Sequence, residues 1–455
     1  MSAEVAAVVL AAGQGTRFRS DRAKVLHEVA GRSMLRWVLE SLRPLGLDRV
    51  VVVVGHQADA VRAEAEGCGV QGLTTVVQAE QRGTGHAVRQ AMEVGALDDA
   101  DTVLVVPGDV PLLTPAPLRR LLDAHGARAA TLLTTRLPDP TGYGRVLRDH
   151  AGEVVRIVEE RDATDAERQV DEVGTSIYAF AREPLAAELA RLSTGNAQGE
   201  EYLTDIIGPL SADAVLAPAE LVAGVNDRAQ LADAGAVLRR RILDRLMREG
   251  VTVIDPASTY VDADAVVEAD AVLRPGTLLE GRCVVGAHAD IGPDARLVDA
   301  IVETGATVTY SVMVEASVGP QATVGPYTYL RPGTRLERGA KAGAFVEIKQ
   351  SVIGEGSKVP HLSYIGDATV GKDANIGAAT VTVNYDGQHK HKTVIGDGAF
   401  IGSDTMLVAP VEVGPRAYTG AGSVITHDVP GGALAVERNE QRIVPDYADR
   451  KRKPR

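Results

Sequence analysis

The chain of 455 residues contains only two cysteines, Cys68 and Cys283, which lie far apart in the sequence. A structural disulfide between them is not expected, and a protein without disulfides suits a reducing compartment such as the cytoplasm. Aromatic residues are also scarce, at 4% of the chain. Because aromatic rings usually fill thick cores, this scarcity fits a thin coil of small aliphatic side chains better than a β-sandwich.

An excess of basic residues and a long apolar run are missing as well. The formal net charge of -13 argues against a general surface for polyanions such as nucleic acids. The basic run at 450–455 is terminal, and we interpret it as a solvated tail. The first apolar run ends at Gly13 without a basic region before it. Neither a signal peptide nor a membrane span is therefore expected.

The most informative pattern that is present is an aliphatic residue at every sixth position of the second half. A period of six belongs neither to an α-helix nor to a flat strand. Small and turn-forming residues separate these positions, so each hexad reads as one short strand and one tight corner, and three hexads would make one coil of a parallel β-helix. The positions are Val261, Val267, Leu273, Leu279, Val285, Ile291 and Leu297, then Val318, Val324, Leu330 and Leu336, then Ile395, Ile401, Leu407 and Val413.

This repeat predicts a left-handed parallel β-helix of hexapeptide repeats, in which many of the 47 glycines form the corners. The repeat is interrupted once, at 380–393, where residues 384–392 are polar and out of register. Loops that break a repetitive fold usually carry function.

The first half of the chain instead alternates short apolar strands with helical stretches. This alternation predicts an α/β domain with a parallel, doubly wound (Rossmann-like) sheet, whose ligands sit at the carboxyl ends of the strands. The predicted strands are 5–10, 50–54, 76–77 and 102–106, and the predicted helices are 34–42 and 58–66.

A third helix is predicted at 231–248, where the spacing of apolar residues is helical and Gly250 is a stop signal. We interpret it as a linker between the two architectures. The predicted domains are then 1–229, a helical linker at 230–250, and the β-helix with its basic tail at 251–455.

Glycine-rich segments follow the predicted strands of the first half. Residues 13–17 read Gly-Gln-Gly-Thr-Arg. The two glycines would let backbone amides approach a phosphate group, which Arg17 and Lys24 could neutralise. Alone, such a loop could equally be a plain turn, but more segments of the kind that contact ligands occur in the same domain, at 83–86, 107–109, 141–144 and 224–226.

Together these segments closely resemble, over nearly the whole chain, the bifunctional bacterial N-acetylglucosamine-1-phosphate uridyltransferases and glucosamine-1-phosphate N-acetyltransferases. The resemblance implies that the β-helix acetylates glucosamine 1-phosphate from acetyl-CoA. The first domain would then transfer UMP from UTP to N-acetylglucosamine 1-phosphate and release pyrophosphate. It further implies a cytoplasmic homotrimer that requires Mg²⁺ and acts on small molecules in UDP-N-acetylglucosamine biosynthesis, which feeds peptidoglycan and cell-envelope polysaccharides.

The same resemblance implies the residues of the uridyltransferase site. Gln78 would read the base, while Gly144 and Glu159 would bind the sugar. Asp109 and Asn226 would ligate Mg²⁺, because both offer oxygen, although Asp109 alone could simply cap a turn. The complete implied set is Leu10, Ala11, Ala12, Gly13, Arg17, Lys24, Gln78, Gly83, Thr84, Pro107, Gly108, Asp109, Gly144, Glu159 and Asn226.

The chain departs from the family pattern at three places. Gly174-Thr175-Ser176 stands where the family usually has Asn-Thr-Gly, so one side-chain contact to the sugar nucleotide cannot be made. Either a neighbouring group or water replaces this contact, or the affinity for the sugar is weaker. The other two departures are Gln14 for the usual Lys and Ala23 for the usual Pro. They bear on affinity more than on reaction type.

The resemblance also assigns residues of the β-helix. A lone histidine on a β-helix is more often structural, but His361 occurs with several polar side chains spaced about one coil apart, and a neutral imidazole can accept a proton from an attacking amine. His361 would thus be the general base. Arg331, Lys349, Tyr364 and Asn375 would stack in one region and bind the sugar phosphate, and acetyl-CoA would contact Ala378, Asn384, Tyr385, Lys390, Ser403, Ala421 and Arg438.

Two other interpretations stay open. The first is a sugar nucleotidyltransferase with one activity, whose β-helix serves only for assembly or regulation. His361 and the loop with Asn384 and Tyr385 argue against it, because a scaffold needs neither. The second is a nucleotide-sensing subunit without catalysis, which the pair Asp109 and Asn226 disfavours.

Overall fold

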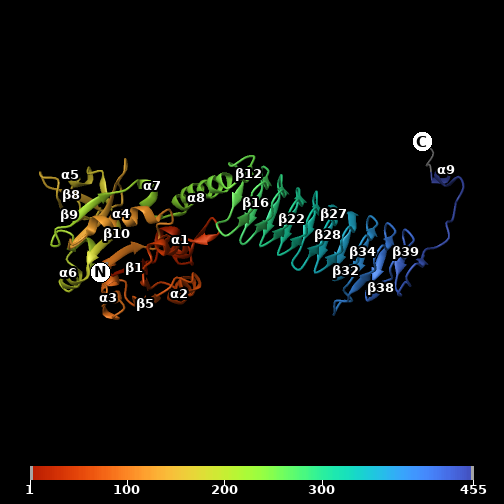
Figure 1. Cartoon of the computed structure of the whole chain (residues 1–455), viewed down its shortest axis with the longest axis horizontal. Helices are drawn as coiled ribbons and strands as arrows, with labels where there is room; N and C mark the ends of the chain where they lie inside the picture. The colour runs from red at the N-terminus through yellow and green to blue at the C-terminus, as the bar shows by residue number, and fades with distance from the viewer. Residues whose placement is uncertain (1–3, 452–455) are drawn as a thin grey trace. The chain divides into compact units, whose positions relative to one another are not determined.

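The computed structural model describes residues 4–451, which form two compact units. The first unit ends at Leu238 and the second begins at Arg239. Helix α8 (Arg228–Arg248) contains this boundary, so one helix carries the chain from the first unit into the second (Figure 1). Of the predicted basic tail, Arg450 and Lys451 lie in α9 (Tyr447–Lys451), and residues 452–455 lie outside the described residues.

The first unit is built around a nine-stranded sheet in the order β11-β7-β10-β6-β1-β4-β5, to which β8 and β9 are added beside β10. Its strands are β1 (Val5–Ala11), β4 (Arg49–Val54), β5 (Leu73–Val77), β6 (Thr102–Pro107), β7 (Ala130–Arg136), β8 (Arg145–Arg148), β9 (Val154–Val158), β10 (Glu172–Ala181) and β11 (Asp213–Leu216). A separate small ribbon pairs β2 (Glu28–Val29) with β3 (Arg32–Ser33).

Helices cover this sheet on both faces, as expected for a doubly wound fold. They are α1 (Met34–Leu42), α2 (Ala58–Gly67), α3 (Thr84–Glu93), α4 (Pro115–His125), α5 (Asp165–Arg168), α6 (Arg182–Leu189) and α7 (Ala219–Val222). Neighbouring residues of β1 point to opposite cores. Val8 packs in the core with Val88 of α3, whereas Val9 packs in the core with Leu35 of α1.

The doubly wound fold is confirmed, but the expectation of an entirely parallel sheet is wrong at β10. Strand β1 pairs in parallel with β4 and β6, whereas β10 runs antiparallel to β6 and β7. A parallel neighbour needs a crossover connection over one face of the sheet. The chain reaches β10 instead through the β8–β9 hairpin, in which Arg145 of β8 pairs with Val173 near the start of β10.

The second unit is a parallel β-helix with three sheets, which we call its first, second and third faces. The first face runs from β12 (Thr252–Val253) to β41 (Leu434–Ala435), the second from β13 (Tyr260–Val261) to β40 (Val424–Ile425), and the third from β14 (Val266–Val267) to β38 (Val411–Val413). Leu273 pairs with Ile291 one coil later, and both side chains are buried. The predicted left-handed β-helix of hexapeptide repeats is confirmed.

The repeat is less regular than the sequence suggested, because it is shortened at several corners in addition to the predicted interruption. Val285 pairs with Val302, which is 17 residues away and still fully buried. Between β19 (Arg296–Val298) and β20 (Ile301–Val302) only two residues remain to form the corner. A corner can lose a residue without changing which side chains point inward, so the core is unaffected.

The predicted interruption is a projecting hairpin between β34 (Val381–Val383) and β35 (Thr393–Ile395). Tyr385 and Lys390 form an antiparallel bridge across it, and the His391 amide donates to the Asn384 carbonyl at 2.8 Å. The polar segment is thus folded back on itself and not extended. Among the helices of residues 4–451, none combines the length and apolar character needed to cross a membrane.

Candidate active sites

A cavity of about 530 Å³ opens at the carboxyl ends of β1 and β6 in the first unit. Ligands of doubly wound sheets bind at this edge. The residues predicted for the uridyltransferase site line the cavity except for Ala11 and Gly108. Ala11 is buried within the sheet, and the Gly108 amide donates to the Leu10 carbonyl at 2.9 Å, so both residues shape the wall from behind.

The glycine loop between β1 and the following turn meets Lys24 closely. Gly15 has a left-handed backbone with φ +63°, and a Cβ there would lie 2.5 Å from the Cβ of Lys24. Only glycine is tolerated in such a position. At Gly13, by contrast, a Cβ would meet nothing within 4 Å. Gly15 therefore lets Lys24 reach the cavity, while Gly13 leaves its backbone open to a ligand.

Two oxygen-bearing side chains converge on the Lys24 ammonium. Lys24 Nζ donates to the Asp109 carboxylate in a short contact and to Asn226 Oδ1 at 3.1 Å. Arg17 Nη2 donates to the same Asn226 oxygen at 2.9 Å. The Val225 amide bonds the Asp109 carbonyl at 2.9 Å, which fixes Asn226 beside Asp109 although the two are far apart in sequence. The cluster presents two cations and two oxygen ligands to one end of the cavity.

Another end of the cavity is lined by Gln78, which follows β5 and is buried. Gln78 Nε2 donates to the Gly83 carbonyl at 3.0 Å and lies 3.0 Å from His86 Nδ1. Gly83 has φ +108°, and a Cβ there would collide with the Glu201 backbone. The hydroxyl of Thr84 accepts the Leu203 amide at 3.1 Å. Thr84 therefore supports the wall in addition to lining it.

A third part of the cavity surrounds the carboxyl of Glu159. Burial raises the pKa of this carboxyl above its usual range, and the hydrogen bond from Thr204 Oγ1, at 3.1 Å, opposes the shift. At Gly144, a Cβ would lie 3.4 Å from Glu159 Oε1. A largely desolvated carboxyl beside a glycine suits a ligand that donates hydroxyl hydrogen bonds, such as a sugar.

Several lining residues were missed by the sequence analysis. Some are neighbours of predicted positions and would be found by extending each motif by a few residues. Thr204 has no such signal, because it lies in a short 3-10 turn that no motif marks. The lining residues outside every segment named from the sequence are Val25, Gln81, Ala87, Val110, Ile157, Tyr178, Glu200 and Thr204.

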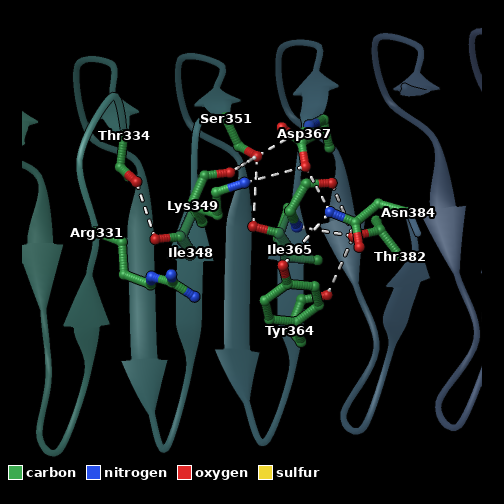
Figure 2. A network of polar contacts seen from close by, with 12 residues as sticks. Arg331, Thr334, Ile348, Lys349, Ser351, Tyr364, Ile365, Asp367, Thr382 and Asn384 are labelled. Atoms are coloured by element: carbon green, nitrogen blue, oxygen red, sulfur yellow. Dashed lines mark hydrogen bonds and ion pairs between the residues drawn. The ribbon is translucent and has the colours of Figure 1, made fainter. Parts of the chain in front are cut away.

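The second unit holds a separate polar cluster on its second face (Figure 2). Lys349 ends β28 (Glu347–Lys349), and its Nζ lies 3.4 Å from Asp367 Oδ2. Asn384 Nδ2 donates to the same Asp367 oxygen at 2.5 Å and lies 3.4 Å from the Tyr364 hydroxyl. Asp367 was missed by the sequence analysis, yet it joins Lys349 to Asn384.

Arg331 extends this cluster by one coil. It follows β25 (Tyr329–Leu330), and its amide donates to the Ile348 carbonyl at 2.9 Å, which places it alongside Lys349. Its Nη1 pairs with Glu347 Oε1 at 2.8 Å, and Figure 2 shows the guanidinium on the same face as Tyr364. Arg331, Lys349 and Tyr364 therefore gather on one face, as their spacing predicted.

The projecting hairpin adds Lys390 to the cluster, because the side chains of Lys390 and Lys349 interact electrostatically. The hairpin is held by Asp386, whose carboxylate accepts the His389 amide at 2.6 Å and lies 2.7 Å from His391 Nε2. These contacts keep the pKa of Asp386 well below its usual range, the backbone amide of His389 contributing most. The sequence implied Lys390 as a coenzyme residue, whereas the structure joins it to the implied sugar-phosphate residues.

His361 ends β30 (Lys358–His361) on the first face and directly precedes the corner that leads to Tyr364. Its side chain is exposed, and its carbonyl accepts the Ala379 amide at 3.3 Å. The same corner repeats in the next coils, since the Asp404 amide bonds the Ala378 carbonyl at 2.7 Å and the Gly422 amide bonds the Ser403 carbonyl at 2.9 Å. His361 therefore heads a row of corners that includes three implied coenzyme residues, Ala378, Ser403 and Ala421.

Arg438 and Asn375 complete the implied residues of the second unit. Arg438 Nη1 donates to the Ala421 carbonyl at 3.1 Å, which ties it to the row of corners. Asn375 does not join Arg331, Lys349 and Tyr364. It lies in β33 (Asn375–Ile376) on the first face, paired with Lys358, so the expectation that all four stack in one region is wrong for Asn375. Asn375 follows Tyr364 by only 11 residues, less than the 17 that separate paired residues of successive coils such as Val285 and Val302, so it falls on a different face.

Comparisons with known proteins agree with the two architectures of the chain. Residues 7–204 match the MobA-like NTP transferase domain family, and residues 392–427 match the bacterial transferase hexapeptide (six repeats) family. The chain is 53% identical over 462 residues to the bifunctional protein GlmU of Thermobifida fusca, with 99% of this chain and 95% of the relative covered.

Two more relatives carry the same name. The protein of Mycolicibacterium vanbaalenii is 50% identical, covering 99% of this chain and 94% of the relative. That of Brevibacillus brevis is 48% identical, covering 98% of each. With one polar site in each of two units and relatives of this similarity along their whole length, the chain belongs to the bifunctional GlmU family.

Proposed function

We propose that the chain catalyses two consecutive reactions of UDP-N-acetylglucosamine biosynthesis. The second unit acetylates glucosamine 1-phosphate from acetyl-CoA, and the first unit transfers UMP from UTP to the resulting N-acetylglucosamine 1-phosphate. The observation that carries this proposal is that each unit has its own polar site. The first contains Lys24, Asp109 and Asn226, and the second contains Lys349, Asp367 and the nearby His361.

Uridyltransfer needs little covalent chemistry from the protein. A phosphate oxygen of the sugar phosphate attacks the α-phosphorus of UTP, and the bond to the pyrophosphate leaving group breaks. Catalysis of such a transfer comes from positioning and charge neutralisation. Arg17 and Lys24 supply the positive charge, Gln78 holds the base, and Glu159 accepts hydrogen bonds from the sugar. These assignments follow the resemblance and the position of each side chain in the cavity.

The residues in the first unit fit a Mg²⁺ ion. Asp109 and Asn226 direct their oxygens at the same point, where Lys24 now supplies the positive charge. No group of three or more His, Cys, Asp or Glu side chains in residues 4–451 could hold a metal by itself. Asp109 and Asn226 would therefore hold the ion together with substrate oxygens and water, and Mg²⁺ would supply charge neutralisation to the phosphates.

Acetyl transfer is assigned to the second unit. The amino nitrogen of glucosamine 1-phosphate attacks the thioester carbonyl, the carbon–sulfur bond breaks, and the thiol of coenzyme A leaves. His361 accepts the proton that the amine loses. Arg331 and Lys349 neutralise the sugar phosphate, and Tyr364 orients the ring. Ala378, Ser403, Ala421 and Arg438 lie along the row of corners that starts at His361, which suits a long, extended donor such as acetyl-CoA.

We further propose a cytoplasmic homotrimer with separable domains at 1–229 and 251–455. Asn375 is separated from the other sugar-phosphate residues by lying on another face, so a site that uses all of them is best completed by a neighbouring chain. Phe345 and Leu362, at successive corners beside His361, are 60% and 62% exposed and offer apolar area for such contacts.

Assays of both half-reactions on the purified protein test the proposal. We expect pyrophosphate release from UTP with N-acetylglucosamine 1-phosphate, and thiol release from acetyl-CoA with glucosamine 1-phosphate. A protein that releases pyrophosphate but never thiol would support the alternative in which the β-helix is only a scaffold.

A further inference from the structure

Strand β10 carries a serine in an unusual backbone conformation at the wall of the uridyltransferase cavity. The pairing of β10 with β7 shifts register between Gly174 and Ile177, which is a β-bulge. Ser176 lies in this bulge with φ +60°, in the left-handed region that favours glycine. Bulges often re-aim a side chain near an active site. Ser176 is exposed and lines the cavity.

Among Gly174, Thr175 and Ser176, only Ser176 offers the cavity a hydroxyl with capacity for a ligand. Gly174 has no side chain. Thr175 is buried, and its hydroxyl already donates to the Leu133 carbonyl at 2.6 Å. A serine hydroxyl can donate one hydrogen bond and accept two. Because Ser176 is exposed and lines the cavity, its hydroxyl has hydrogen-bonding capacity available to a ligand there.

Ser176 lies at the sugar end of the cavity. Its side chain interacts with that of Tyr178, which is buried and whose pKa is raised by burial first and by the charge of Glu159 next. Tyr178 therefore links Ser176 to the surroundings of Glu159. Ile157, Glu159 and Thr204 line the same part of the wall.

We propose that Ser176 is a sugar-binding residue that sets affinity for N-acetylglucosamine 1-phosphate, and that it replaces the side chain missing at Gly174. In the Asn-Thr-Gly pattern of similar enzymes the polar residue comes first and glycine last, whereas here Gly174 comes first and Ser176 last. The hydroxyl then reaches the substrate's hydroxyl or acetamido group from the bulge. This inference rests on the proposed uridyltransferase activity.

The test compares Ser176→Ala, Ser176→Gly and the double variant Gly174→Asn/Ser176→Gly in the full chain. We expect Ser176→Ala to raise the KM for N-acetylglucosamine 1-phosphate roughly fivefold, as for the loss of one neutral hydrogen bond, without changing the KM for UTP. Ser176→Gly should raise the same KM while its melting temperature does not fall, because glycine adopts φ +60° without strain. The double variant should recover the KM, because a Cβ at Gly174 meets side-chain atoms of Ile157 alone, the nearest being the flexible Cδ1 at 3.2 Å.

Ser211 provides the matched control, since it too is an exposed left-handed serine of the first unit, with φ +48°, but does not line the cavity. Ser211→Ala and Ser211→Gly should leave every KM unchanged. A melting temperature of the first unit that does not fall reports that each variant is intact. A Ser176→Ala enzyme with the wild-type KM for the sugar phosphate would overturn the assignment, as would an equal rise in the KM for UTP. A wild-type chain without pyrophosphate release would instead reject the proposed function.

Discussion

Lys349 Nζ lies 3.4 Å from Asp367 Oδ2, and the side chain of Lys390 comes close enough to Lys349 for the two positive charges to interact. The interaction with Lys349 lowers the pKa of Lys390 below its ordinary value, because a second positive charge nearby disfavours the protonated form. Arg331 adds a further positive charge that acts on Lys390. Such a group is best completed by an anion with two negative charges, such as a sugar phosphate.

Replacing Lys390 by Gln should therefore weaken binding of glucosamine 1-phosphate. A hydrogen bond to a charged group contributes about 1.5–3 kcal/mol, so the KM for the sugar phosphate should rise roughly tenfold or more, with a smaller change in the KM for acetyl-CoA. Lys392→Gln, in the same hairpin, is the control and should change neither. If the KM for acetyl-CoA rises instead, Lys390 serves the coenzyme, as the family resemblance implied.

The same interaction predicts a pH dependence. Because its pKa is lowered from the ordinary value of 10.5, Lys390 loses its proton at a lower pH than an isolated lysine. The positive charge available to the phosphate is complete below the lowered pKa and decreases as the pH rises through it. The KM for glucosamine 1-phosphate should rise at alkaline pH in the wild type. This rise should be weaker in Lys390→Gln, and an identical pH profile in the two proteins would contradict the prediction.

Glu159 is expected to destabilise the first unit at neutral pH while it serves the site. Its pKa in the folded protein is raised from 4.5 by burial. The stability that its protonated form contributes is present below pH 4.5 and is lost as the pH rises through the raised pKa. Glu159→Gln should therefore raise the melting temperature of the first unit at neutral pH by roughly a few degrees. It should also raise the KM for N-acetylglucosamine 1-phosphate.

The neighbouring Glu160 is the matched control for this prediction. Its pKa is lowered, chiefly by the hydrogen bond from Arg145, so its carboxylate stabilises the fold above pH 4.5. Glu160→Gln should lower the melting temperature at neutral pH, opposite to Glu159→Gln. Calorimetry at neutral and acidic pH checks both signs. A gain from Glu159→Gln that persists undiminished below pH 4.5 would show that burial of the charge is not its cause.

Asp109→Ala should lower uridyltransfer roughly a hundredfold or more, because one of two oxygen ligands and the partner of Lys24 are both lost. Acetyl transfer should not change, since its site lies in the other unit. Asp109→Asn keeps one oxygen without the charge and should retain more activity than Ala at high Mg²⁺. Pyrophosphate release measured across a Mg²⁺ titration checks this. Wild-type activity of Asp109→Ala at low Mg²⁺ would reject Asp109 as a ligand.

The sequence predicts the β-helix well because each buried position is specified locally. Leu273 and Ile291 point inward through the geometry of their own hexads, and pairing follows from stacking one coil on the next. The direction of β10 is not encoded in this way, because it depends on how the β8–β9 hairpin folds back to pair with β10.

The residues of the two sites also divide into those that the local sequence marks and those that only tertiary packing reveals. Asp109 and Lys24 are marked by motifs next to strand ends, so they could be named before their geometry was known. The interaction between Lys349 and Lys390 and the left-handed backbone of Ser176 could not, because both arise from tertiary packing. A hairpin must fold back, or a strand must bulge, before these side chains reach their sites.

The last prediction concerns separability. Ala234 and Leu238 of α8 pack with Phe18 in a core of the first unit, so the fragments are cut at the boundary between the units, as residues 1–238 and 239–455. Each should retain one complete activity when expressed alone, since each polar site lies within a single unit. The first fragment should release pyrophosphate. The second should release thiol and have the mass of a trimer by light scattering if a neighbouring chain joins Asn375 to the sugar-phosphate residues on the other face, as we propose. His361→Ala in the full chain should abolish thiol release alone. A fully active monomeric second fragment would contradict the shared site, and normal acetyl transfer by His361→Ala would remove the proposed base.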